Sequence, residues 1–96
     1  MDTTDLKLKF EFQLANNFLE MKKIRSFKNL QLLLDKYGYY KGAKRLINGQ
    51  ETTGLRDLIL ADRIDLSIEY LALLEEFRPL FSEDELKKCK RKLGIS

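Results

Sequence analysis

The sequence predicts an all-α protein: a single helical domain over residues 1–96, folded as a compact orthogonal bundle of five to six short helices. Apolar residues recur at helical spacing through most of the chain, and residues that start or end helices flank these segments. The composition is 44% hydrophobic and 34% charged, with one Pro and five Gly among 96 residues, which is typical of a small folded domain.

The N-terminal segment fits two structures. Apolar and polar residues alternate from Leu6 to Leu14, which is the period of a strand. Apolar residues also recur every three or four positions from Leu6 to Met21, which is the period of a helix. Because the rest of the chain offers no partner strand, we expect a helix from Asp5 to Ile24. If the segment is a strand, pairing with a second copy would satisfy its edges and produce a homodimer.

Two helices are predicted next. The first covers residues 27–37, with Ser26 as N-cap and Gly38 in the left-handed position after its last turn. The second covers residues 39–47 and ends at Asn48. The residues expected to face the core are Phe27, Leu30, Leu33 or Leu34, Tyr37, Ala43, Leu46 and Ile47.

A fourth helix is predicted after the polar loop at 50–53, with Thr52 or Thr53 as its cap and Asp62 closing it in a left-handed conformation. Asp65 or Ser67 should start a fifth helix, and Pro79 prevents that helix from continuing. The inward positions of both helices are Leu55, Leu58, Ile59, Ile68, Leu71, Ala72 and Leu74.

The last helix has the clearest start signal. Ser82 and Glu85 have the spacing of a capping box, and Phe81 and Leu86 have that of a hydrophobic staple. Acidic residues occupy the first turn and basic residues the last, and Gly94 ends the helix. Its apolar stripe is narrow, as in a helix on the surface of a bundle, and consists of Leu86, Cys89 and Leu93.

Residues 37–86 contain three runs, YGYYKGAKRLI, TTGLRDLILADRIDLSIEYLAL and FRPLFSEDEL, that resemble a helical module recurring in bacterial and phage proteins of unknown function. The chain departs from that pattern at Ile59, Asp62 and Glu75. The resemblance implies an all-helical fold and no particular activity. The matching positions are Gly38, Ala43, Leu46, Gly54, Leu58, Arg63, Asp65, Leu66, Ser67, Glu69, Phe77, Leu80, Phe81, Ser82 and Glu85.

Charge is distributed in blocks. The formal net charge is +3, but residues 22–45 and 86–96 are basic, whereas residues 46–85 are acidic. We favour pairing between these blocks within the fold; the alternative is a basic surface for an anionic or other macromolecular partner. The candidate residues of such a surface are Lys22, Lys23, Arg25, Lys28, Lys41, Lys44, Arg45, Lys88, Arg91 and Lys92.

Several kinds of chemistry are disfavoured. The chain has no His, which removes the commonest general base and the imidazole metal ligands, and the single Cys89 allows no internal disulfide. Cys89 is expected to be buried rather than reactive. We predict no cofactor and no metal, and we do not expect an enzyme, although carboxylate chemistry stays open. With no membrane span or leader pattern, we expect a cytoplasmic protein.

Two polar features invite a functional interpretation. Arg63, Asp65, Ser67 and Glu69 could form a site, but we interpret them as a structural turn in which a helix is capped and Arg63 pairs with Glu69. Residues 42–60 resemble a helix-turn-helix, yet the second helix offers one Arg among mostly apolar residues.

The sequence therefore favours a small helical protein that binds another macromolecule, and the partner that we expect is a protein. The alternative is a nucleic-acid-binding module of helix-turn-helix type, and an enzyme using carboxylates comes third.

Overall fold

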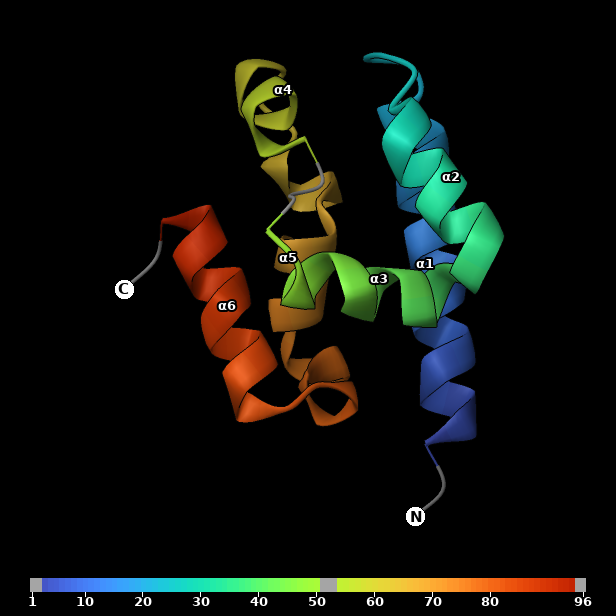
Figure 1. Cartoon of the computed structure of the whole chain (residues 1–96), viewed down its shortest axis with the longest axis vertical. Helices are drawn as coiled ribbons and strands as arrows, with labels where there is room; N and C mark the ends of the chain where they lie inside the picture. Colours follow the sequence, from blue (N-terminus) through green and yellow to red (C-terminus); the bar gives the residue numbers. More distant parts are fainter. Residues whose placement is uncertain (1–2, 51–53, 95–96) are drawn as a thin grey trace.

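The computed structural model describes residues 3–50 and 54–94 (Figure 1). Within these residues the chain forms six α-helices, two short 3-10 helices and no strand, which confirms the all-α class. In Figure 1, α3 crosses between the upright helices α1 and α6. The elements are α1 (Thr4–Met21), α2 (Lys28–Tyr37), α3 (Tyr39–Asn48), α4 (Leu55–Leu60), η1 (Ile64–Leu66), α5 (Ile68–Leu73), η2 (Glu75–Leu80) and α6 (Glu83–Leu93).

The N-terminal segment is one helix, so the strand alternative is wrong. α1 ends at Met21, three residues before the predicted Ile24. The backbone hydrogen bond that follows spans three residues instead of the four of an α-helix, because the Ile24 N–H donates to the Met21 carbonyl at 2.9 Å. The predicted helical face is confirmed. It buries Phe10, Leu14, Phe18 and Met21, with Leu6 packed against the same core.

The start of α2 differs from the prediction. Its N-cap is Phe27 rather than Ser26, and Phe27 has a left-handed backbone (φ 48°) that costs an L residue about 1–2 kcal/mol. The Phe27 ring is buried and lies close to Gly54 of a distant segment. A Cβ at Gly54 would be 2.7 Å from the ring, and φ there is 73°, so this position requires glycine.

α2 and α3 are joined at Gly38, as predicted, with φ 84°. The Gly38 N–H donates to the Leu34 carbonyl at 2.8 Å, and its own carbonyl accepts from Gly42 at 2.9 Å. Of the residues expected to face the core, Leu33 and Tyr37 are half-buried. The rest are buried: Phe27, Leu30, Leu34, Ala43, Leu46 and Ile47.

α4 has only six residues. Thr52 and Thr53, its predicted caps, lie outside the described residues, and the N-cap is Gly54. Leu55 and Leu58 are buried as expected, but Ile59 is 57% exposed, so its predicted inward position is wrong. A helix this short buries a single narrow face, and Ile59 lies one step around the axis from it. Asp62 is left-handed (φ 58°), as predicted.

α5 starts at Ser67, whose hydroxyl accepts from the Tyr70 N–H at 3.0 Å; Asp65 lies in η1 instead. The predicted inward residues Ile68, Leu71 and Ala72 are buried. Leu74 is not, because it is the extended residue that ends the helix. The chain continues through Pro79 as the 3-10 turns of η2, so no α-helix passes through this proline.

α6 has the predicted capping box. The Ser82 hydroxyl accepts from the Glu85 N–H at 3.1 Å, and the Glu85 carboxylate accepts from the Ser82 N–H at 2.9 Å. Gly94 ends the helix with φ 76°. Phe81 is buried and Leu86 half-buried at the staple positions.

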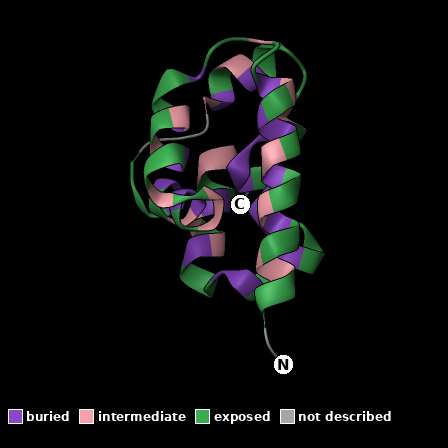
Figure 2. Ribbon diagram, turned by 90° about the vertical axis from the view of Figure 1, so that its right-hand side faces the viewer, coloured by how far each residue is buried: buried purple, intermediate pink, exposed green. Residues whose placement is uncertain are grey.

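The core draws residues from all six α-helices and both 3-10 helices of the described chain, and Figure 2 colours the buried residues purple. An aromatic cluster holds α1 in place: the Phe10 ring makes edge contacts with Phe77 and Phe81, both with centroids 5.4 Å apart. Tyr40 joins the cluster, and its hydroxyl donates to the Leu80 carbonyl at 2.8 Å. These contacts position α1 against α3, η2 and the residue that follows η2.

Candidate partner-binding surfaces

α1 has a second apolar face that points away from the core. Leu8, Phe12 and Leu19 are 58%, 75% and 60% exposed, and Ala15 is half-buried between them. Each residue turns the helix by about 100°, so the spacing of four, three and four places all of them within about 60° of one another. An exposed apolar stripe of this kind is typical of a docking surface rather than of a solvated face.

The two faces of α1 explain why its sequence alternates. Successive apolar residues such as Leu6 and Leu8 are separated by about 200° around the axis, so alternate positions fall on opposite sides of the helix. Leu6, Phe10 and Leu14 face the core, whereas Leu8 and Phe12 face outward. The strand-like pattern is therefore produced by a helix that is apolar on two sides.

The ends of this stripe carry opposite charges. Asp5 lies beside its N-terminal end and Lys22 beside its C-terminal end, and both are exposed. Other charged residues of α1 are paired along the sides. Lys9 contacts Glu76 at 2.7 Å, and Glu20 contacts Lys23 at 3.1 Å.

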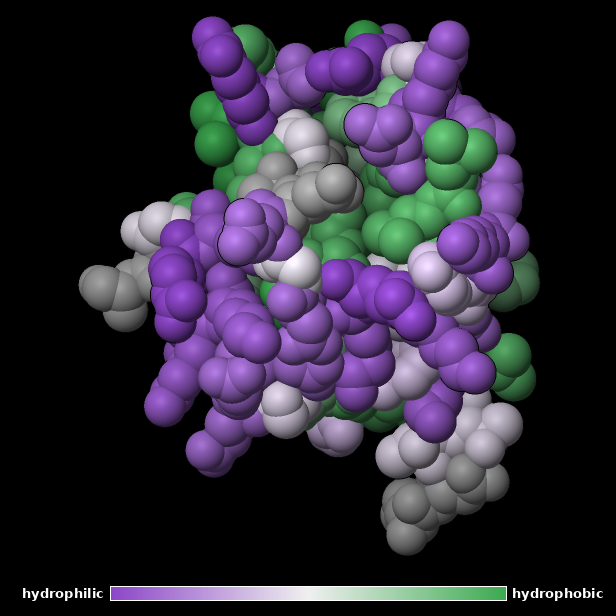
Figure 3. All heavy atoms as spheres, viewed as in Figure 1, coloured by the Kyte–Doolittle hydropathy of each residue, from purple (hydrophilic) through white to green (hydrophobic). Residues whose placement is uncertain are grey.

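α3 and α6 pack against each other and bring together basic residues from two distant segments. Figure 3 shows hydrophilic side chains over both helices, with a hydrophobic area above them between α2 and α4. The six candidate basic residues on this pair of helices are Lys41, Lys44, Arg45, Lys88, Arg91 and Lys92.

Three of these six residues have a described hydrogen-bond or ion-pair partner within the fold. Lys92 donates to the carbonyls of Leu46, Ile47 and Gly49 at 2.7, 3.0 and 3.0 Å, and so caps the end of α3. Lys88 forms an ion pair with Asp84 at 3.1 Å. It also donates a hydrogen bond to the side-chain oxygen of Asn48, the last residue of α3, at 3.0 Å. These residues attach α6 to α3.

The third of them, Lys44, pairs with the buried Glu85 at 3.3 Å. Glu85 also accepts from Asn48 at 2.8 Å. Burial favours a raised pKa for Glu85, but hydrogen bonds from Ser82 and Asn48 and the charge of Lys44 outweigh it and hold that pKa below its usual range. Burial opposes the charge of Lys44, yet Tyr40 and Glu85 beside it raise its pKa.

The basic residues near α1 and α2 are also partly engaged. Arg25 forms an ion pair with Asp57 of α4, joining a basic block to the acidic one. Lys22 lies over the ring of Phe18, and Arg45 lies 4.0 Å from the centroid of Tyr37. Pairing between blocks therefore accounts for part of the charge pattern. The candidates that are exposed and have no described carboxylate partner are Lys22, Lys28, Lys41, Arg45 and Arg91.

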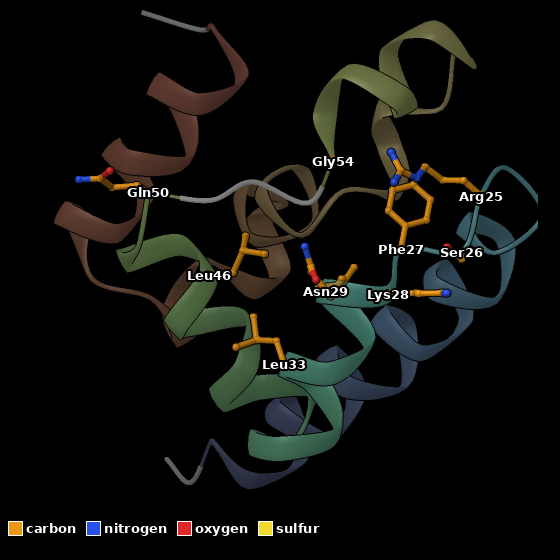
Figure 4. A pocket seen from close by; sticks show the side chains of 10 residues that line it. Arg25, Ser26, Phe27, Lys28, Asn29, Leu33, Leu46, Gln50 and Gly54 are labelled. Carbon is orange, nitrogen blue, oxygen red and sulfur yellow. The ribbon is translucent and has the colours of Figure 1, made fainter.

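An open groove of about 600 Å³ lies between the starts of α2 and α4 and the end of α3 (Figure 4). The Arg25 guanidinium lies 5.5 Å from the Phe27 ring at one end of the groove, on the side of Gly54 (Figure 4). No carboxylate is among its described lining residues, so it offers cationic, amide and apolar groups. They are Arg25, Ser26, Phe27, Lys28, Asn29, Leu30, Leu33, Leu46, Gln50 and Gly54.

The polar turn has a structural arrangement. Arg63 pairs with Asp65 at 3.3 Å, where both side chains are exposed, so the ion pair described for Arg63 is not the predicted one with Glu69. Hydrogen bonding to Asp65 raises the pKa of Arg63. Glu69 is fully buried beside α6, and Ser67 caps α5. These residues do not converge on a shared space.

Cys89 is buried, as predicted. Burial, together with the nearby Glu69 carboxylate, raises the pKa of Cys89 to about 12. A thiol with that pKa is almost wholly protonated at neutral pH and is a poor nucleophile. In the part of the chain that the structure describes, no three carboxylate or thiol groups are placed to hold a metal ion.

The helix-turn-helix interpretation finds little support in α4. Of the polar residues of α4, Arg56 is exposed, but Asp57 forms an ion pair with Arg25. The exposed remainder is Ile59 and Leu60, which cannot hydrogen-bond base edges.

No protein family model, characterised protein or solved structure matches this chain. No helix in residues 3–50 and 54–94 combines the length and apolar character needed to cross a membrane.

Proposed function

We propose that this protein works by binding another macromolecule, and that the partner is a protein. The observation that supports this is the exposed apolar stripe of α1, formed by Leu8, Phe12, Ala15 and Leu19. Keeping large apolar side chains in water is unfavourable, and their alignment along one helix face provides the anchors with which helices dock onto proteins.

The position of α1 makes the stripe suitable for docking. Its opposite face is fixed by the aromatic cluster around Phe10, so the exposed face is presented on a rigid helix. A preorganised surface loses little conformational entropy on binding. Phe12 is the expected anchor, because a large aromatic side chain at the centre of an interface contributes strongly to binding.

A photo-crosslinking experiment tests the proposal. A benzophenone amino acid replaces Phe12 in one variant and Leu32 in another. Leu32 is a matched control, because it is 67% exposed but stands alone on α2 among polar neighbours. We expect protein adducts in cells from position 12 that are absent from position 32. The same adducts from both positions, or none from position 12, would contradict the proposal.

The alternative is nucleic-acid binding, which is favoured by Lys41, Arg45 and Arg91. All three are exposed, and they lie on the adjacent helices α3 and α6. Binding to phosphates weakens steeply as salt rises, with a slope that reports the number of contacts. A titration of generic duplex DNA in low salt tests this alternative. Absence of binding there removes it, whereas salt-dependent binding lost on replacing Lys41 and Arg45 by Gln would favour it over protein binding.

A further inference from the structure

We propose that the protein that covers the α1 stripe is a second copy of this chain, bound with the two α1 helices antiparallel. This inference rests on the proposed function, because it names the partner of the same surface. The stripe residues Leu8, Phe12, Ala15 and Leu19 follow the four-three-four spacing of a two-helix seam, in which each side chain packs between those of the facing helix.

The sizes of the side chains favour this partner. A two-fold axis midway between Phe12 and Ala15 brings Phe12 of each copy against Ala15 of the other, a large side chain facing a small one. The same axis brings Leu8 against Leu19. All four residues of the stripe then meet a complementary residue, as an isologous interface requires. In a parallel pair, Phe12 would face Phe12 and Ala15 would face Ala15.

The charges at the ends of the stripe favour the same direction. Asp5 and Lys22 are equally far from the proposed axis, so each lies against the opposite charge of the second copy. Both side chains are exposed in the single chain, and the described contact of Lys22 is with the Phe18 ring rather than with a carboxylate. A parallel pair would place Asp5 beside Asp5 and Lys22 beside Lys22, which is unfavourable.

The size of the seam sets the expected strength. α1 has 18 residues, so the facing helices overlap over about 27 Å at most. One helix pair of this length covers less than the roughly 800 Å² per partner of a standard interface. The dimer should therefore be in exchange with monomer, with a dissociation constant on the order of 1–100 µM.

Sedimentation equilibrium from about 1 µM to about 1 mM tests whether the dimer forms. We expect Phe12→Glu to weaken association about 30-fold or more, because Phe12 is the central anchor. The control Leu32→Glu makes the same kind of change at an exposed position outside the stripe and should leave association within about twofold of the parent chain. A monomer throughout the range, or equal effects of the two substitutions, would overturn the proposal.

A cross-linking experiment tests the direction of the helices without a disruptive charge. Leu8→Cys and Leu19→Cys are prepared separately and treated with a short bis-maleimide, alone and as a mixture. The native Cys89 is buried and does not compete. We expect cross-linked dimer from the mixture and little from either variant alone; dimer from the separate variants would establish a parallel pair and overturn the antiparallel arrangement.

The two sets of experiments separate the proposals. A protein that stays monomeric yet yields adducts with a different protein from position 12 refutes the homodimer and leaves protein binding intact. A monomer with no adduct from position 12 refutes both.

Discussion

Replacing Lys92 by Met should weaken the attachment of α6 to the end of α3. The ammonium donates to three backbone carbonyls, those of Leu46, Ile47 and Gly49, and Met keeps the apolar length of the side chain while removing these donors. A hydrogen bond from a charged group contributes about 1.5–3 kcal/mol, and a cation at a helix C-terminus adds about 0.3–1 kcal/mol. Allowing for water that replaces part of this bonding, we expect the free energy of unfolding to fall by about 2 kcal/mol.

Two measurements check this value. Urea unfolding followed by circular dichroism gives the change in stability directly. The rate at which a thiol reagent labels Cys89 gives a second reading, because the buried thiol reacts only when α6 detaches. If α6 reattaches faster than the reagent reacts with Cys89, a loss of about 2 kcal/mol makes the labelling rate about 30-fold higher.

The control is Lys90→Met, which makes the same chemical change two residues away on the same helix. Lys90 is exposed and has no described hydrogen bond or ion pair, so its replacement should change stability by less than about 0.5 kcal/mol. Equal unfolding midpoints and equal labelling rates for the two variants would refute the capping role and return Lys92 to the candidate binding residues.

Three further outcomes are expected. Leu71→Ala should lower the free energy of unfolding by about 2–5 kcal/mol, and an unchanged thermal melt would show that the core face of α5 is misassigned. Gly54→Ala should cost more than Gly38→Ala: both positions have positive φ, but only at Gly54 does the new methyl meet Phe27, and equal urea midpoints would contradict that contact. The pKa of Glu85 is lowered by folding, so the carboxylate stabilises the protein fully above about pH 5 and loses this contribution as the pH falls through the folded pKa. Between about pH 5 and pH 3, the Glu85→Gln variant should therefore lose less stability than the parent chain. Identical acid profiles of the two proteins would contradict this contribution of Glu85.

Local signals in the sequence were sufficient for most helix ends. The capping box of Ser82 and Glu85, the left-handed Asp62 and the turn at Gly38 depend on residues close together in the chain, and the structure confirms all of them. The start of α2 could not be found in this way. The left-handed backbone of Phe27 is held by its contact with Gly54, 27 residues later, and nothing beside Phe27 in the sequence marks that contact.

The candidate basic residues show the same difference between features set by neighbouring residues and features set by distant contacts. Basic side chains were recognisable as a group, but Lys92 and Lys44 have partners more than 40 residues away, so the sequence could not separate them from exposed residues such as Lys41. The exposed stripe of α1 also left a trace in the sequence, as the alternation of apolar and polar residues in the N-terminal segment. The alternation around Phe12 fits either a strand or one apolar helical face, whereas the structure shows a helix with two apolar faces.

The two-faced helix has a consequence during protein synthesis. α1 is made before the elements it packs against, which are α3, η1 and η2, whereas α2 with α3 and α5 with α6 pack against near neighbours in the chain. At about 5–20 residues per second, η2 is made several seconds after α1. During that interval the core face of α1 lacks its contacts with η2, so both apolar sides of the helix are exposed at once.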